Sequence, residues 1–434
     1  MMMIMISSSQ FLLFLVVALM VFGMPASAFQ VFAGGPLAKS PFSQGQKHGE
    51  QQHYETLQKT LGIPNGLMNT LLQQNDDFSR RIWLVDNSGS MRQEDGHKLA
   101  KKPKASASNH KEDENWLATN DDVSRWSELQ ETVLLHAQLS AALHQPTEFR
   151  LLNIPNAESG DKKEHKRRLS FTKSSSASTG TIVPSSFRVG YDTSMKDGFK
   201  EAQSILSKTK PSGQTPLLQS LATIREEIVS DLLPQLKADG TKVAIVIVTD
   251  GAGNHNMDNL GQDEASLHQE FMDSIRELLE GLPVTVVLRL CTDYGPIVDL
   301  YNQLDAELDG LDVLDDYHAE ASEVAQHNPW LNYALILHRM REMGQSSQLF
   351  DLLDERTLSR DELAQFCQLI FGTPEERGEG DRPLPDPNTD WIGFLNRIQT
   401  WQKDEKLQFN PLTKKMAPWV DVDFLSLFSF VPRN

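Results

Sequence analysis

The sequence predicts an α/β fold, with a doubly wound domain around a mainly parallel central sheet and a small helical C-terminal region. Short runs rich in Val and Ile alternate with longer segments whose apolar residues have helical spacing. The run KVAIVIV (242–248) is continuously apolar, as in a strand buried on both faces of a parallel sheet. No repeat of solenoid period is visible, which excludes a stacked-repeat architecture.

The first half of the domain begins with RIWLV (81–85), a short and partly β-branched run that predicts a buried strand. The segment 126–144 has helical spacing and is apolar nearly all round, so we expect a well-covered helix. EFRLLNI (148–154) predicts the next strand, and FRVGYD (187–192) predicts an edge strand. The segment 194–208 predicts a helix, after which PSGQTP turns the chain.

The second half repeats the same alternation. LLQSLATIREEIVSDLLPQL (217–236) predicts a helix that leads into the 242–248 strand. The segment 263–282 predicts another helix, and VTVVLRLC (284–291) predicts the next strand of the sheet. A further helix is expected at 296–308 and a last edge strand at 311–317. In such sheets, ligands bind beyond the carboxyl ends of the strands.

Two polar insertions interrupt the domain, which spans residues 78–345. Residues 92–125 are of mixed charge and rich in Lys, Ser and Asn, so we expect a surface loop near the site, disordered or ordered by a partner. Residues 155–186 contain the basic run KKEHKRR and predict a second exposed loop. The composition of both segments places them outside the core.

The C-terminal region, residues 346–434, predicts helices interrupted by a linker at 372–390. FDLLDERTLSRDEL lacks the central glycine and the alternating acids of a calcium loop, and instead predicts a helix break with Ser359 as N-cap and Glu362 completing a capping box. We expect the three tryptophans of this region in its core rather than in a binding platform: Trp391, Trp401 and Trp419.

The N-terminus predicts a targeting segment. An apolar run from Phe11 to Met24 is too short to span a membrane comfortably and precedes a small-x-small pattern at 26–28, so residues 1–28 predict a cleaved signal peptide, with a retained anchor as the alternative. ASAF resembles the junction of bipartite presequences in algae with complex plastids. Residues 29–77 then read as a transit-like segment and linker with one short helix. A plastid and the secretory pathway or exterior both remain open, with no stable membrane span after signal removal.

Charge and cysteine content exclude some classes of function. The 41 basic and 59 acidic residues give a net charge of −18, which repels phosphate backbones, so we expect no nucleic-acid partner. Only two cysteines occur, Cys291 and Cys367, too few for a disulfide framework or a cysteine zinc site. No oligomeric state follows from the sequence.

Five oxygen-bearing side chains form a candidate metal site. Asp86, Ser88 and Ser90 alternate in RRIWLVDNSGSM directly after the first strand, so their side chains face the same way in an extended segment. Thr215 lies in SGQTPL before a helix, and Asp250 ends the 242–248 strand. These places converge on one edge of a parallel sheet. Five oxygen donors suit Mg²⁺, with Mn²⁺ or Ca²⁺ as lesser candidates, and two carboxylates leave the ion able to accept a carboxylate from a partner.

D-x-S-x-S at 86–90, the threonine of G-x-T-P at 215 and the aspartate of T-D-G at 250 resemble the metal-ion-dependent adhesion site (MIDAS) of von Willebrand factor type A (vWA) domains. The resemblance covers roughly residues 78–320 and departs from the family in the two insertions. It implies a Rossmann-like fold, one divalent cation and a non-enzymatic role in binding a protein through the metal. It also implies that Asp250 reaches the ion mostly through water.

Other functions fit less well. A haloacid-dehalogenase phosphatase needs a second aspartate where Ser88 stands, and without it the phosphoryl transfer loses its proton shuttle. No G-x-S-x-G surrounds either serine, against a serine hydrolase. GGPLAKS (34–40) has Ala38 where a phosphate-binding loop requires glycine. An accessory subunit that recruits an ATPase or another enzyme, as in chelatase-like assemblies, stays open. His255 follows the metal aspartate and reads as a solvent-exposed histidine.

Overall fold

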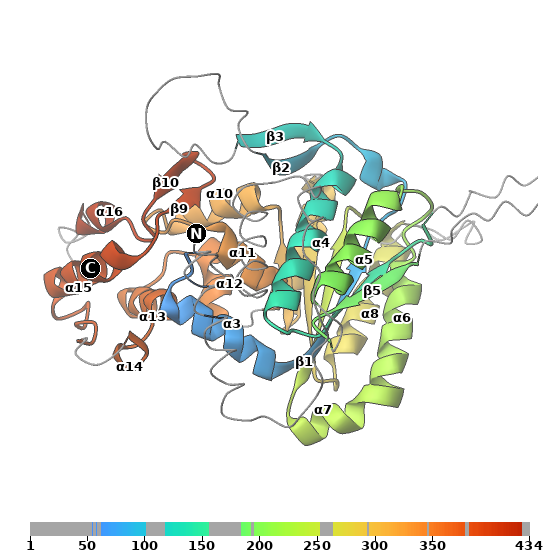
Figure 1. The fold of residues 1–434 in the computed structure, drawn as a ribbon, viewed down its shortest axis with the longest axis horizontal. Coiled ribbons are helices and arrows are strands. Elements are labelled where there is room, and N and C mark those ends of the chain that lie inside the picture. Colours follow the sequence, from blue (N-terminus) through green and yellow to red (C-terminus); the bar gives the residue numbers. More distant parts are fainter. Residues whose placement is uncertain are drawn as a thin grey trace, which may run out of the picture.

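The computed structural model describes residues 62–100, 118–155, 184–191, 195–251, 264–292, 295–344, 347–377 and 382–427, together with Tyr54 and Gln58. A six-stranded sheet lies at its centre in the order β5-β4-β1-β6-β7-β8 (Figure 1). The strands of this sheet are β1 (Phe78–Val85), β4 (Thr147–Leu151), β5 (Ser186–Val189), β6 (Lys242–Thr249), β7 (Val284–Leu290) and β8 (Leu311–Leu314).

All strands of the sheet are parallel except β5, which pairs antiparallel with β4 at one edge. The strand order reverses direction at β1, because β4 lies on one side of it and β6 on the other. Parallel sheets with helical crossovers open a crevice at such a switch point, beyond the carboxyl ends of the strands. The α/β, Rossmann-like fold predicted from the sequence is confirmed, and both predicted edge strands lie at edges.

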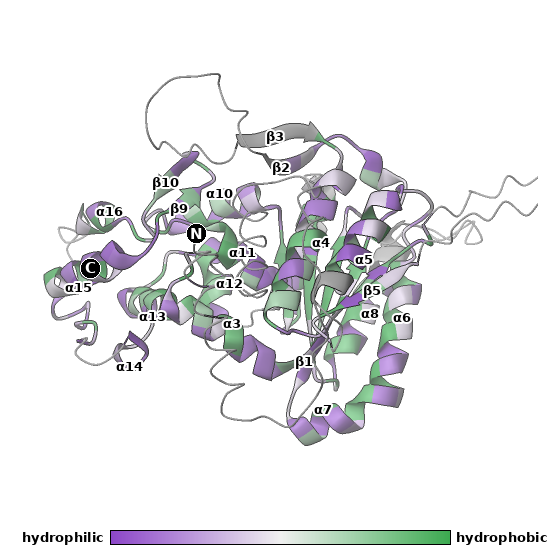
Figure 2. Ribbon diagram, in the orientation of Figure 1, coloured by the Kyte–Doolittle hydropathy of each residue, from purple (hydrophilic) through white to green (hydrophobic). Residues whose placement is uncertain are grey.

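Helices cover both faces of the sheet. Side chains of β1 alternate, so that Trp83 and Val85 pack under α4 and α5, while Ile82 and Leu84 pack under α6 and α8. Figure 2 shows hydrophobic residues on the strands and mixed polarity on the outer helices. The helices of this part are α4 (Arg125–Ala142), α5 (Met195–Lys208), α6 (Leu217–Glu227), α7 (Leu233–Asp239), α8 (Glu264–Leu279), α9 (Gly295–Glu307) and α10 (Tyr317–His327).

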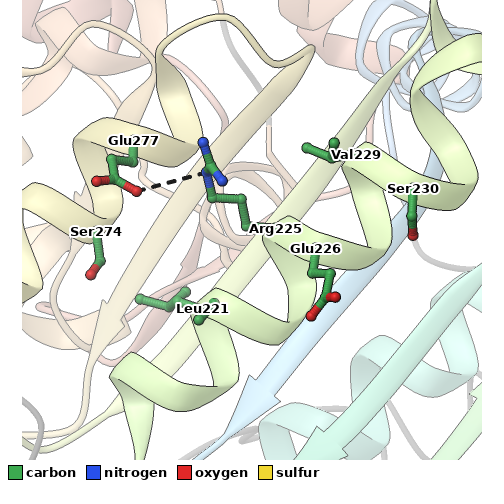
Figure 3. A pocket seen from close by; sticks show the side chains of 8 residues that line it. Leu221, Arg225, Glu226, Val229, Ser230, Ser274 and Glu277 are labelled. Carbon is green, nitrogen blue, oxygen red and sulfur yellow. Dashed lines mark ion pairs between the residues drawn. The ribbon is translucent and has the colours of Figure 1, made fainter.

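The helix predicted at 217–236 contains a π-helical segment, η4 (Ile228–Leu232), between α6 and α7. Pro234 explains the irregularity, because it has no backbone N–H and its ring clashes with a carbonyl one turn earlier in a regular α-helix. Figure 3 shows a hollow between α6 and α8, where Arg225 and Glu277 form an exposed ion pair of 3.8 Å. None of the five predicted metal ligands lines this hollow.

Part of the insertion at 92–125 differs from the surface loop predicted. Its ends pair as an antiparallel hairpin of β2 (Gly96–Ala100) and β3 (Ala118–Val123), and a short 3-10 turn, η2 (Ser90–Arg92), precedes it. Composition missed the hairpin because the two strands are short and polar, so neither carries an apolar alternation. The rest of this insertion, most of 155–186 and His255 lie outside the described residues.

The C-terminal region is helical, as predicted, and it shares a core with an N-terminal helix. Helix α3 (Asn65–Asp77), within the segment read as transit-like and linker, packs against α13 and buries Leu67 and Leu71 completely. Both leucines belong to a hydrophobic core that also contains apolar residues of α11 and α13. Helix α11 (Leu335–Glu342) precedes the region, whose own elements are α12 (Gln348–Glu355), α13 (Arg360–Phe371), α14 (Pro374–Arg377), α15 (Trp391–Trp401), η5 (Gln402–Asp404), β9 (Gln408–Asn410), β10 (Lys415–Ala417) and α16 (Val422–Leu427).

Two expectations for this region are confirmed. Ser359 and Glu362 form the capping box at the start of α13. Trp401 and Trp419 are fully buried in the core, whereas Trp391 is partly exposed and stacks on Phe394. Within the described residues no helix is long and apolar enough to cross a membrane.

Acidic side chains gather where β8 meets α10 and α12. The guanidinium of Arg341 contacts the carboxylates of Asp312, Glu320 and Asp354 at 2.7 to 3.1 Å. Burial, reinforced by Asp312, raises the pKa of the Asp351 carboxyl to about 7, and the pKa of Asp305 is raised to about 7 in the same way. One arginine therefore offsets only part of the negative charge buried at this place.

Candidate metal centre

The predicted site lies at the switch point of the sheet. Asp86 follows β1 directly, and Asp250 follows β6, the neighbouring parallel strand. The backbone N–H of Asp86 donates to the carbonyl of Val248 at 3.0 Å, which continues the ladder to the carboxyl edge. Both carboxylates are thus delivered to the same edge by two strands whose apolar residues anchor them in the core.

The three residues of the D-x-S-x-S segment form a connected group with Asp250. The Asp86 carboxylate accepts a hydrogen bond from the backbone N–H of Ser88 at 2.8 Å. The Ser88 and Ser90 hydroxyls lie 2.9 Å apart, and the Ser90 hydroxyl donates to Asp250 Oδ1 at 2.9 Å. Asp86 and Ser88 are completely buried and Asp250 nearly so. Four of the five predicted ligands therefore share one hydrogen-bonded cluster.

Thr215 is brought to this cluster by the loop that precedes α6. The backbone N–H of Gly89 donates to the carbonyl of Gly213 at 3.1 Å, and that of Ser212 donates to the carbonyl of Asn87 at 2.8 Å. These bonds hold residues 212–215 beside the D-x-S-x-S segment. Thr215 is 3% exposed. The fifth predicted ligand therefore lies in a loop that is bonded to the segment carrying three of the others.

Two asparagines fix the loops, and the sequence did not indicate them. The side-chain amide of Asn87 donates to the carbonyl of Asn153 at 2.9 Å, and the backbone N–H of Asn153 donates to Asn87 Oδ1 at 2.8 Å. The Asn153 amide also donates to the carbonyl of Gln214 at 2.7 Å, next to Thr215. Gly213 has a positive φ of 90°, and a Cβ there would lie 2.6 Å from Asn153 Oδ1. The turn therefore requires glycine at this position.

The electrostatics of the site favour a cation. Burial raises the pKa of the Asp86 carboxyl to about 6, and the negative charge of Asp250 acts in the same direction. A hydrogen bond of 2.7 Å from the Thr249 hydroxyl to Asp86 Oδ2 partly offsets this shift. Two buried carboxylates that repel each other gain stability when a positive ion binds between them.

Arg125, which the sequence analysis did not single out, lies beside the predicted ligands. It is 6% exposed, and its Nη1 donates to Asp250 Oδ2 at 2.8 Å. Its Nε and Nη2 donate to the two oxygens of Asp95 at 2.7 and 2.6 Å. The sequence contained one indication of this contact. An arginine in the first turn of α4 is unfavourable with the helix dipole, and a nearby carboxylate offsets this.

The donor set fits a hard divalent ion. Two carboxylates and three hydroxyls provide only oxygen ligands, which suit Mg²⁺, Mn²⁺ or Ca²⁺. Cys291 follows the adjacent strand β7, and its backbone N–H donates to the carbonyl of Thr249 at 2.8 Å. Burial raises the pKa of its thiol to about 12. The arrangement can hold a cation and present it to an outside oxygen ligand.

Comparisons with known proteins identify no family for this chain. No family model matches the chain, and no curated protein matches it.

Proposed function

We propose that this chain is a non-enzymatic, vWA-like protein that binds a partner protein through a divalent cation, most suitably Mg²⁺, at the edge of its sheet. The observation that carries the proposal is the cluster at the switch point, where Asp86, Ser90 and Asp250 converge and backbone hydrogen bonds hold the loop of Thr215 beside the D-x-S-x-S segment. The motif spacing in the sequence and the repulsion between the two carboxylates point the same way.

In this proposal the chain's own residues hold the ion and prepare it for a ligand. Asp86 and Asp250 supply the negative charge, and the hydroxyls of Ser88, Ser90 and Thr215 supply neutral oxygens. The bound ion supplies an electrophilic position that attracts a carboxylate. Thr249 and the Ser88 N–H orient Asp86, so that its oxygens are fixed before an ion arrives. The partner is expected to contribute an Asp or Glu side chain.

The direct test is Mg²⁺ binding measured by calorimetry on the wild-type chain and on Asp86→Ala. We expect binding to be lost in Asp86→Ala while the far-ultraviolet circular dichroism stays that of the wild type. Asp239→Ala, which removes an exposed carboxylate at the end of α7, is the matched control and should bind as the wild type does. Unchanged Mg²⁺ affinity in Asp86→Ala would contradict the proposal.

The partner is tested by pull-down with the wild-type chain, with and without EDTA. Partners that bind through the ion should disappear when EDTA removes it and return with added Mg²⁺. Partners that are all retained in EDTA, and equally by Asp86→Ala, would argue against docking through the metal. An ATPase among the EDTA-sensitive partners would instead favour the accessory role, in which the chain recruits an enzyme to its substrate.

A further inference from the structure

The charge of the candidate metal centre depends on a residue that is not one of its ligands. The guanidinium of Arg125 contacts Asp250 at 2.8 Å and is almost completely buried. Its other side is held by both oxygens of Asp95, whose side chain is 38% exposed. Arg125 therefore joins a predicted metal ligand to a carboxylate at the rim.

We propose that Arg125 is a positioning residue that lowers the cation affinity of the centre and keeps a bound cation attractive to an outside carboxylate. This inference rests on the proposed function. Asp86 and Asp250 alone would neutralise a divalent ion. With the guanidinium of Arg125 in contact, the buried groups keep a net positive charge after the ion binds, which a carboxylate from a partner then offsets.

The contacts also fix the orientation of Asp250. One carboxylate oxygen, Oδ1, accepts from Ser90, and the other, Oδ2, accepts from Arg125. Because each oxygen has its own donor from a different element, the carboxylate has one preferred rotamer. Arg125 thereby holds Oδ1 on the side of the D-x-S-x-S segment, where the other predicted ligands lie.

Asp95 extends this connection to the β2–β3 hairpin. It directly precedes Gly96, the first residue of β2. The base of the hairpin is fixed to α4 by two further bonds, from the Arg125 N–H to the carbonyl of Gln93 at 3.0 Å and from the His97 N–H to Glu128 at 2.9 Å. A partner that displaces the hairpin base would withdraw Asp95 and leave the guanidinium to Asp250 alone.

Two variants that change the charge in opposite directions test the inference on the full chain. Mg²⁺ binding, measured by calorimetry, is the readout. Arg125→Gln removes the buried positive charge, so we expect Mg²⁺ to bind about tenfold more tightly. Asp95→Asn leaves that positive charge without its outer partner, so we expect binding about threefold weaker, a smaller effect because Asp95 is partly exposed. Opposite signs are the signature of a charge effect.

A merely structural role predicts a different pattern, in which both variants bind Mg²⁺ more weakly. Weaker or unchanged binding in Arg125→Gln, with wild-type circular dichroism, would overturn the inference while leaving the proposed function intact. If Arg125→Gln does not fold, Arg125→Lys keeps the charge and should bind Mg²⁺ within about threefold of wild type. Tighter or unchanged binding in Asp95→Asn would then overturn the inference. A wild-type chain that binds no Mg²⁺ would overturn the proposed function itself.

Discussion

Replacing Gly213 by alanine should disturb the candidate site without altering any predicted ligand. Gly213 has a φ of 90°, and its carbonyl accepts the hydrogen bond from Gly89 that aligns the two loops. A Cβ at this position would lie 2.6 Å from Asn153 Oδ1, closer than real contacts allow. Either the loop or Asn153 must therefore move.

The magnitude follows from two contributions. A left-handed backbone costs a non-glycine residue about 1–2 kcal/mol. Moving Asn153 weakens its hydrogen bonds to Asn87 and to the carbonyl of Gln214, each of which contributes about 1 kcal/mol. We therefore expect Gly213→Ala to lower the free energy of unfolding by about 2–4 kcal/mol. Mg²⁺ affinity should fall as well, because the Thr215 loop no longer aligns with Ser88 and Ser90.

Gly240→Ala is the matched control. Gly240 also has a positive φ, 67°, but a Cβ there meets no atom within 4 Å. This control should lose only about 1–2 kcal/mol from backbone strain and should keep its Mg²⁺ affinity. Urea unfolding and calorimetry measure both quantities on both variants. Equal stability losses together with unchanged Mg²⁺ binding in Gly213→Ala would refute the reasoning.

Three further predictions concern the rest of the chain. Leu71→Ala should destabilise the protein by about 2–4 kcal/mol in urea unfolding, because Leu71 of α3 is fully buried; a loss no larger than that of the exposed Asn69→Ala would mean that α3 is not part of the folded core. The pKa of Asp351 is raised to about 7 from 3.8, so the folded chain binds this proton more tightly than the unfolded chain, and the residue's contribution to stability falls as pH rises from about 4 through 7. Asp351→Asn should therefore narrow the difference between the urea midpoints of unfolding at pH 5 and pH 8. An unchanged difference would contradict this prediction. A fluorescent fusion of residues 1–60 distinguishes the two destinations left open: arrival in a complex plastid that is lost with Phe29→Ala would favour the plastid, and export of the unaltered fusion from the cell would exclude it.

Local patterns were sufficient for the six strands of the central sheet and for the helices that connect them. The run at 242–248 became β6 (Lys242–Thr249), and the other predicted elements differ from the observed ones by a few residues at their ends. These patterns reflect which side of each element is buried, and that information is repeated every few residues. The convergence of Asp86 and Asp250 followed too, since parallel neighbours share an edge.

Such local patterns did not predict contacts between segments that are distant in the sequence. Nothing in the polar composition of the segment before residue 78 indicated that α3 packs on α13, which lies nearly three hundred residues later in the chain. The β2–β3 hairpin was missed because its strands are short and polar. Arg125 was missed because its role depends on Asp95, which lies in the insertion, and on Asp250, which directly follows β6.

The sequence by itself determined the alternation of strands and helices that builds the central sheet, the five oxygen-bearing candidates and their common edge of the sheet. Only the tertiary structure decided that Arg125 lies against Asp250, that Asn153 and Gly213 align the Thr215 loop, and that α3 completes the C-terminal core. The physical reason is the range of the interactions. Periodicity records the burial of each element along the chain, whereas hydrogen bonds and ion pairs join whichever side chains the folded chain brings within about 3 Å.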